Sequence, residues 1–196
     1  MSTNPVIREV ERIVEAACAS ESNVFSYGIW THHIKQVAQM AKLIAPQFNA
    51  DPEIVEISAL LHDYAGIKDE ALAETHHIHG PIEAEYILQT LNYPTQKIRA
   101  VKHCIATHRA SVASAKRSPE AECLANADAI VHIQQIPSLL NFVYVHRGMD
   151  IDEGALWVKN KLKRTWKKLS PQMQDKMWEK YAAALETLTG LETEMT

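Results

Sequence analysis

Five times along the chain, proline follows a small polar residue or glycine just before a helix-like apolar pattern. These proline-containing pairs constrain the fold more than any other feature of the sequence. Proline at the first position of a helix sacrifices no hydrogen bond, and a polar side chain before it can cap a free backbone N–H. The pairs therefore predict five helix starts. They are Asn4-Pro5, Asp51-Pro52, Gly80-Pro81, Ser118-Pro119 and Ser170-Pro171.

Apolar residues recur at three- and four-residue spacing between these points, as in Val6, Val10, Ile13 and Ala17. No segment alternates with period two between hairpin turns, and the six glycines leave little material for tight hairpins. The sequence therefore predicts an all-α fold, with residues 64–69 as a loop. The expected helices cover about 5–19, 30–48, 51–62, 80–91, 95–108, 119–134, 139–145, 152–168 and 171–188.

Composition limits the classes of partner. With 196 residues, 46% of them apolar, the chain can bury a full core as one domain over residues 1–196. A net charge of -4 gives no global attraction to nucleic acid or to an anionic membrane, so any phosphate recognition must be local. The cysteines, Cys18, Cys104 and Cys123, are too few and scattered for a disulfide framework. We expect a cytoplasmic protein without a membrane span or a nucleic-acid partner.

Adjacent His62 and Asp63 end the apolar run Ile57 to Leu61, and this dyad is the centre of the functional interpretation. Burying both side chains is costly unless something charged holds them, and a divalent metal ion can do so. The ten histidines of the chain point in the same direction. Further ligands are available at wide spacing: His33, His79, His108 and Asp128.

The order of these phrases resembles the HD superfamily of metal-dependent phosphohydrolases. The likeness spans about residues 30–133, with an N-terminal helix and C-terminal helices packed on that core. It implies a single-domain HD-type helical bundle with a metal site between helices. The phrases are His33-Ile34-Lys35-Gln36-Val37, Ala59-Leu60-Leu61-His62-Asp63, His79-Gly80-Pro81, Ile105-Ala106-Thr107-His108 and Asn126-Ala127-Asp128.

The resemblance also implies roles for individual residues. His62 and Asp63 would be catalytic, and Asp63 would bridge two metal ions that activate water for attack on phosphorus. One or two divalent ions would bind: iron, manganese, magnesium, cobalt or zinc. The ligands would be His33, His62, Asp63 and Asp128 for one ion, and Asp63, His79 and His108 for the other.

Spacing leaves some histidines open. His76 and His77 compete with His79, and His103 competes with His108. Three others, His32, His132 and His146, are assigned ordinary surface or core roles.

The phosphate-binding cations are predicted to come from other positions than in many relatives. Many relatives in the superfamily carry lysine three residues after the dyad, where this chain has Gly66, so Lys68, Lys102 and Arg109 are the candidates. The basic run within residues 152–168 is expected to be a solvated helix face.

The expected partner is a small phosphorylated molecule, a nucleotide by preference. His62-Asp63-Tyr64-Ala65 and His79-Gly80-Pro81 resemble the bacterial hydrolases that split dinucleoside tetraphosphates symmetrically, but the residues after His108 and Asp128 differ from theirs. Two alternatives stay open: a di-iron oxygenase of HD fold acting on a small organic substrate, and a non-catalytic nucleotide-binding HD module. Formation of a homodimer is also left open.

Overall fold

The computed structural model describes residues 4–109 and 118–189, and within these ranges it contains helices and turns but no strand. The prediction of an all-α fold is confirmed. The helices are α1 (Pro5–Cys18), α2 (Lys35–Phe48), α3 (Pro52–Leu61), α4 (Tyr64–Lys68), α5 (His76–Thr90), α6 (Thr95–Thr107), α7 (Pro119–Gln134), α8 (Ile136–Asn141), α9 (Ile151–Trp166) and α10 (Pro171–Thr187), with π-helical turns η1 (Trp30–Ile34) and η3 (Phe142–His146) and a 3₁₀ turn η2 (Glu70–Leu72).

Four of the five proline pairs begin helices as predicted, at α1, α3, α7 and α10. Three of the caps are side-chain hydrogen bonds. Asn4 Oδ1 accepts from the Val6 N–H at 2.9 Å, and Asp51 Oδ1 accepts from the Glu53 N–H at 2.9 Å. Ser118 Oγ likewise accepts from the N–H of the residue three positions later, at 3.2 Å. Local cap chemistry therefore sets these helix starts.

The fifth pair, Gly80-Pro81, lies inside α5, so the predicted helix start there is wrong. The helix begins four residues earlier, at His76, and Pro81 lies in its second turn, where it forfeits the hydrogen bond to the carbonyl of His77. Residues 64–69 also differ from the expected loop, because Tyr64–Lys68 forms the short helix α4.

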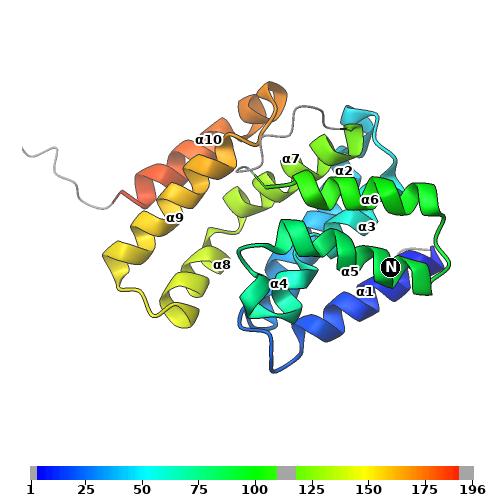
Figure 1. Cartoon of the computed structure of the whole chain (residues 1–196). Helices are drawn as coiled ribbons and strands as arrows, with labels where there is room; N and C mark the ends of the chain where they lie inside the picture. Colours follow the sequence, from blue (N-terminus) through cyan, green and yellow to red (C-terminus); the bar gives the residue numbers. More distant parts are fainter. Residues whose placement is uncertain (1–3, 110–117, 190–196) are drawn as a thin grey trace, which may run out of the picture.

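Helix α7 is the centre of the architecture. It packs against α2, α3 and α6 on one side and against α9 and α10 on the other. Figure 1 shows α9 and α10 side by side at one end of the molecule, with α1 to α6 gathered at the other. Residues 123–131 of α7 are all buried, as expected of a helix covered on every side. This placement puts Asp128, in the middle of α7, at the junction of the two groups.

The core is formed by apolar side chains of the interhelical contacts, including fully buried Leu60, Leu61, Leu124 and Leu162. Burial of this kind contributes about 1.5–3 kcal/mol for each large side chain. No helix within residues 4–109 and 118–189 is long and apolar enough to cross a membrane.

Candidate metal centre

The predicted ligands of the first metal come from three parts of the fold and point to one place. His33 is carried by the π-helical turn η1, and the adjacent His62 and Asp63 follow the end of α3. Asp128 comes from α7. His62 is 0% exposed and Asp128 is 3% exposed. Single π turns are common at functional sites because they re-aim one side chain within a helix, and here that side chain is His33.

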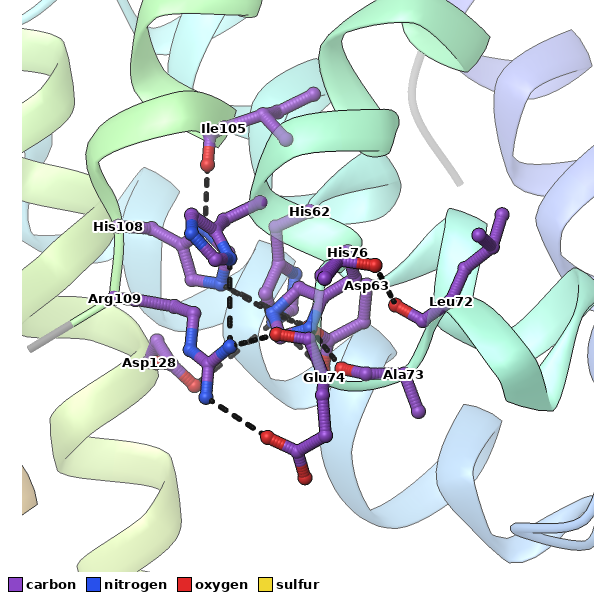
Figure 2. Close-up of polar contacts among 12 residues, drawn as sticks. His62, Asp63, Leu72, Ala73, Glu74, His76, Ile105, His108, Arg109 and Asp128 are labelled. Carbon is purple, nitrogen blue, oxygen red and sulfur yellow. Dashed lines mark hydrogen bonds and ion pairs between the residues drawn. The ribbon is translucent and has the colours of Figure 1, made fainter. Parts of the chain in front are cut away.

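These side chains form two groups that share Asp63. In the first group, Asp63 Oδ2 lies 3.2 Å from both His33 Nε2 and His62 Nε2. In the second, Asp63 Oδ1 lies 3.2 Å from His76 Nε2 and 3.8 Å from His108 Nε2. Figure 2 shows His62, His76 and His108 converging on this carboxylate. Each oxygen of Asp63 thus faces its own set of imidazoles, as a bridging carboxylate does.

The ring nitrogens within these groups face one another. His33 Nε2 and His62 Nε2 are 3.2 Å apart, and His76 Nε2 and His108 Nε2 are 3.1 Å apart. In His62, His76 and His108 the other nitrogen, Nδ1, lies within hydrogen-bond distance of a backbone carbonyl, which can only accept a proton. The carbonyls are those of Ala59 at 2.7 Å, Ala73 at 2.6 Å and Ile105 at 2.6 Å.

These hydrogen bonds place a proton on Nδ1 and leave a lone pair on Nε2 in each neutral ring. In His76 and His108 two such lone pairs face each other at 3.1 Å, and they repel unless a cation binds both nitrogens. Carbonyl bonds on the outer nitrogen are also the usual way in which a protein orients metal-binding imidazoles. The donor set therefore fits divalent metal ions.

Asp128 supports the same conclusion. Its Oδ2 accepts from the ammonium of Lys168, whose side chain is 6% exposed. Its Oδ1 is buried without a hydrogen-bond partner among residues 4–109 and 118–189, and it lies 3.6 Å from His33 Nε2 and 3.9 Å from His62 Nε2. A buried carboxylate oxygen without a donor is costly, and a metal ion in the first group would satisfy it.

Burial and neighbouring charges shift the pKa values of the side chains in the site. Burial would raise the pKa of Asp63, but the neighbouring His62 and His76 hold it well below its usual range. Lys168 has the same effect on the pKa of Asp128. Burial lowers the pKa of His108 well below its usual value. Burial also acts to lower the pKa of His62, but the Asp63 carboxylate outweighs it and the net shift is upward.

His76, rather than the predicted His79, lies beside His108 and Asp63. The reason is the true extent of α5. His76 lies one turn before Gly80, and Gly80 packs so closely that an added Cβ would lie 2.9 Å from Ile105 Cγ2. The buried face of α5 therefore continues back to His76, whereas His79 is rotated away by about 100° from Gly80. Extending the stripe that includes Gly80 and Ala84 by one turn would have found His76 in the sequence.

His132 also lies at the centre, although an ordinary surface or core role is predicted for it from the sequence. Its Nε2 is 3.2 Å from Asp128 Oδ1, and its ring stacks on that of His33 with centroids 4.7 Å apart. Burial, reinforced by the charge of Lys161, lowers its pKa well below the usual value. The signal for it was present, because residues 128 and 132 are one helical turn apart. His103 belongs to none of the described groups that could hold a metal.

A pocket of about 780 Å³ opens from the metal centre toward α8, η3 and α9. Of the three predicted phosphate-binding cations, Arg109 lines it. Lys68 instead pairs with Glu83 at 3.0 Å, and Lys102 pairs with Glu85; neither lines the pocket. The pocket has further cations that the sequence did not predict for this purpose. Lys161, Arg164 and Lys168 belong to the basic run that was expected to be a solvated helix face, and Arg147 directly follows η3.

The fold and the site define an HD-type helical protein with a histidine–aspartate cluster that could hold metal ions. The family model described as HD domain matches residues 30–132, and the chain therefore belongs to the HD domain family. Members of this family are generally metal-dependent phosphohydrolases.

The chain is also similar in fold to two crystal structures of Bacillus subtilis YpgQ. For YpgQ in complex with ADP, the TM-score is 0.66 at 21% identity, with 96% of this chain and 97% of YpgQ covered. For YpgQ described without a ligand, the TM-score is 0.68 at 20% identity, with 97% and 95% covered. No curated protein matches the chain.

Proposed function

We propose that this protein is a metal-dependent hydrolase that cleaves a phosphate ester or phosphoanhydride of a nucleotide. The observation that carries the proposal is the pair of imidazole groups that share Asp63, each with facing Nε2 atoms about 3 Å apart. When bound, divalent ions supply a nucleophile from water and neutralise phosphate charge. The residues that would hold them are His33, His62, Asp63 and Asp128 in one group, and Asp63, His76 and His108 in the other.

The chain's own residues prepare this site for phosphate. The lowered pKa of Asp63 keeps that carboxylate ionised at neutral pH, so it can bridge the two groups. The carbonyl bonds to Nδ1 of His62, His76 and His108 fix the direction of each imidazole. Arg109, held by Glu74 at 3.4 Å, places a guanidinium at the pocket wall, as is common in phosphate sites.

A nucleotide is the preferred substrate for two reasons. The pocket of about 780 Å³ is within the usual range for small-molecule sites and combines cations with aromatic side chains. In addition, YpgQ, a protein of the same fold, has been crystallised with ADP.

The test is metal analysis of protein purified without chelator, combined with an anaerobic screen of nucleotides and phosphodiesters for phosphate release. We expect hydrolysis that needs a divalent ion and that is abolished in the Asp63→Ala and His62→Ala variants. Consumption of O₂ with iron, and no phosphate release, would instead identify an HD-fold oxygenase. Nucleotide binding without turnover in any metal would identify a non-catalytic module.

A further inference from the structure

The cationic side chains that line the pocket differ in whether they form ion pairs within the protein. Lys168 is paired with Asp128, and both arginines at the pocket rim are paired with Glu74, at 3.4 and 3.9 Å. The side chains of Lys161 and Arg164 make no ion pair or hydrogen bond with any residue in the parts of the chain that the structure describes. These two cations are therefore available to an anion in the pocket. The full set of cationic lining residues is Arg109, Arg147, Lys161, Arg164 and Lys168.

Lys161 and Arg164 are three residues apart and lie on one face of α9, so both side chains can reach the same ligand. Lys161 is partly buried, and burial lowers its pKa while the charge of Asp128 opposes that shift. The charge of Lys161 in turn helps to lower the pKa of His132. The ammonium is thus close to the metal centre without being paired there. An unpaired, partly buried cation is costly, and a phosphate group would remove that cost.

The same face of α9 becomes aromatic one turn earlier, at Trp157. Its ring contacts Phe142, with centroids 5.8 Å apart, and Phe142 stacks on Phe25 at 5.4 Å. By the rise of an α-helix, Trp157 lies about 6 Å along the axis from Lys161 and about 10 Å from Arg164. From the N-terminus of α9 onward, the pocket wall is therefore aromatic at Trp157 and then cationic at Lys161 and Arg164. Beyond the end of α9, Lys168 contacts Asp128 at the proposed metal site.

We propose that α9 recognises a nucleoside polyphosphate. Lys161 and Arg164 bind the phosphates next to the one at the metal centre, and the base packs against Trp157. This inference rests on the proposed function and narrows its substrate class. A nucleoside monophosphate has one phosphate, which the metal centre takes, so it leaves Lys161 and Arg164 without a ligand. A phosphoanhydride chain engages both cations at once, which favours di- and triphosphates over monophosphates.

The test compares Lys161→Met and Arg164→Gln with the native protein, all loaded with the metal that the protein is found to hold. Calorimetry would measure the dissociation constants of a non-hydrolysable ATP analogue and of AMP. We expect each substitution to weaken binding of the ATP analogue about tenfold or more, because a charge-assisted hydrogen bond is lost, and to change AMP binding less than about threefold. Lys163→Met is the matched control, since Lys163 is exposed on the same helix and does not line the pocket. We expect it to bind both ligands like the native protein.

The aromatic part has its own variant. Trp157→Leu is expected to weaken binding of the ATP analogue, whose phosphate chain spans Lys161 and Arg164 and so brings the base to Trp157, but to leave binding of inorganic tripolyphosphate unchanged. Equal losses for AMP and the ATP analogue in Lys161→Met, or no loss in either cation variant, would overturn the inference. Its failure is separable from failure of the proposed function. Binding that depends on Lys161 without phosphate release would refute hydrolysis alone, and hydrolysis that is indifferent to Lys161 and Arg164 would refute the role of α9 alone.

Discussion

At the scale of single residues, His76 and His79 offer a clean comparison, because they lie on the same helix and have the same side chain. We expect His76→Ala to lose the metal ion of the second group and to reduce hydrolysis about 100-fold or more, since both His108 and Asp63 lose their partner. His79→Ala is expected to keep both the metal ion of the second group and the rate of hydrolysis. Metal content per chain and the rate of phosphate release would measure the difference. Equal effects of the two substitutions would show that α5 presents another face to the centre.

Some residues of the site can be predicted from the local sequence, whereas others depend on the tertiary structure. His62 and Asp63 could be placed from the sequence because an apolar helix delivers them directly to the interior. His33, His108 and Asp128 followed from helix faces and from the likeness to the HD family. His76 was left open as a competitor of the preferred His79, and His132 and Lys168 were not predicted as site residues, because each depends on a tertiary detail. For Lys168 that detail is the turn after α9, which folds back onto α7.

At the scale of elements, Lys168 fastens the segment between α9 and α10 to α7. Its ammonium pairs with Asp128, and two residues later the Ser170 N–H donates to Asn126 Oδ1 at 2.8 Å. Removing one partner of a buried ion pair leaves the other charge uncompensated and costs about 3–5 kcal/mol. We expect Lys168→Met to lower the free energy of unfolding of the metal-free protein on this scale. Bound metal should reduce the loss, because it neutralises the Asp128 carboxylate.

Urea denaturation with and without metal would test this expectation. Lys167→Met is the control, since the neighbouring Lys167 is exposed and has the same charge. If both variants lose equal stability, the pair between Lys168 and Asp128 does not hold the C-terminal helices on α7.

The close approach of α5 and α6 supplies a second test at the element scale. An added methyl group in Gly80→Ala would lie 2.9 Å from Ile105 Cγ2, so either the Ile105 side chain or the helices must shift. We expect a loss of stability of about 1–3 kcal/mol from overpacking, together with weaker metal binding, because His76 is one turn away on the same face. Thermal unfolding and metal titration would measure the two effects.

A double-mutant cycle provides the control. Ile105→Ala removes the obstructing methyl group, so the double variant should be less destabilised than the sum of the single variants. Strict additivity would mean that Gly80 is required for another reason. Helix α5 also shows why element boundaries were the weaker part of the sequence analysis. The Gly80-Pro81 pair has the local chemistry of a helix start, but tertiary packing on His62 and Ile105 extends the helix backwards past it.

At the scale of the whole molecule, the all-α class could be predicted because cap and periodicity signals are local. The shape of the pocket could not, because it depends on how α8, η3 and α9 cover a centre built by residues 30–132. This is why the basic run of α9 was expected to be solvated. Seen alone, Lys161 and Arg164 fit an exposed face as well as a pocket wall, and only the packing of α9 on α7 distinguishes the two.

The stability of the whole molecule should depend on metal and pH together. Bound metal stabilises the folded chain by mass action, but metal and protons compete for the same imidazoles. In the metal-free protein the pKa of His62 is raised by Asp63 although burial acts against it, so His62 keeps its proton to a higher pH than an ordinary histidine and must release it to bind metal. The pKa of His108 is already well below its usual value, so its imidazole is neutral and releases none. Acidification should therefore weaken metal binding through His62 and not through His108.

The sign of the effect follows from these shifts. A raised pKa at His62 contributes stability to the metal-free protein at low pH, and that contribution is lost as pH rises through the raised pKa. The stability of the metal-bound form depends on His62 in the opposite direction. It increases as pH rises, because metal binds only the deprotonated Nε2 of that imidazole. The difference in melting temperature between metal-loaded and chelator-treated protein should thus grow from about pH 6 to about pH 8, the range that surrounds the ordinary pKa of histidine. Scanning calorimetry across this range would measure it, with proton release on metal binding measured in buffers of different ionisation enthalpy. A difference that stays constant with pH, with no protons released, would show that His62 is not a metal ligand.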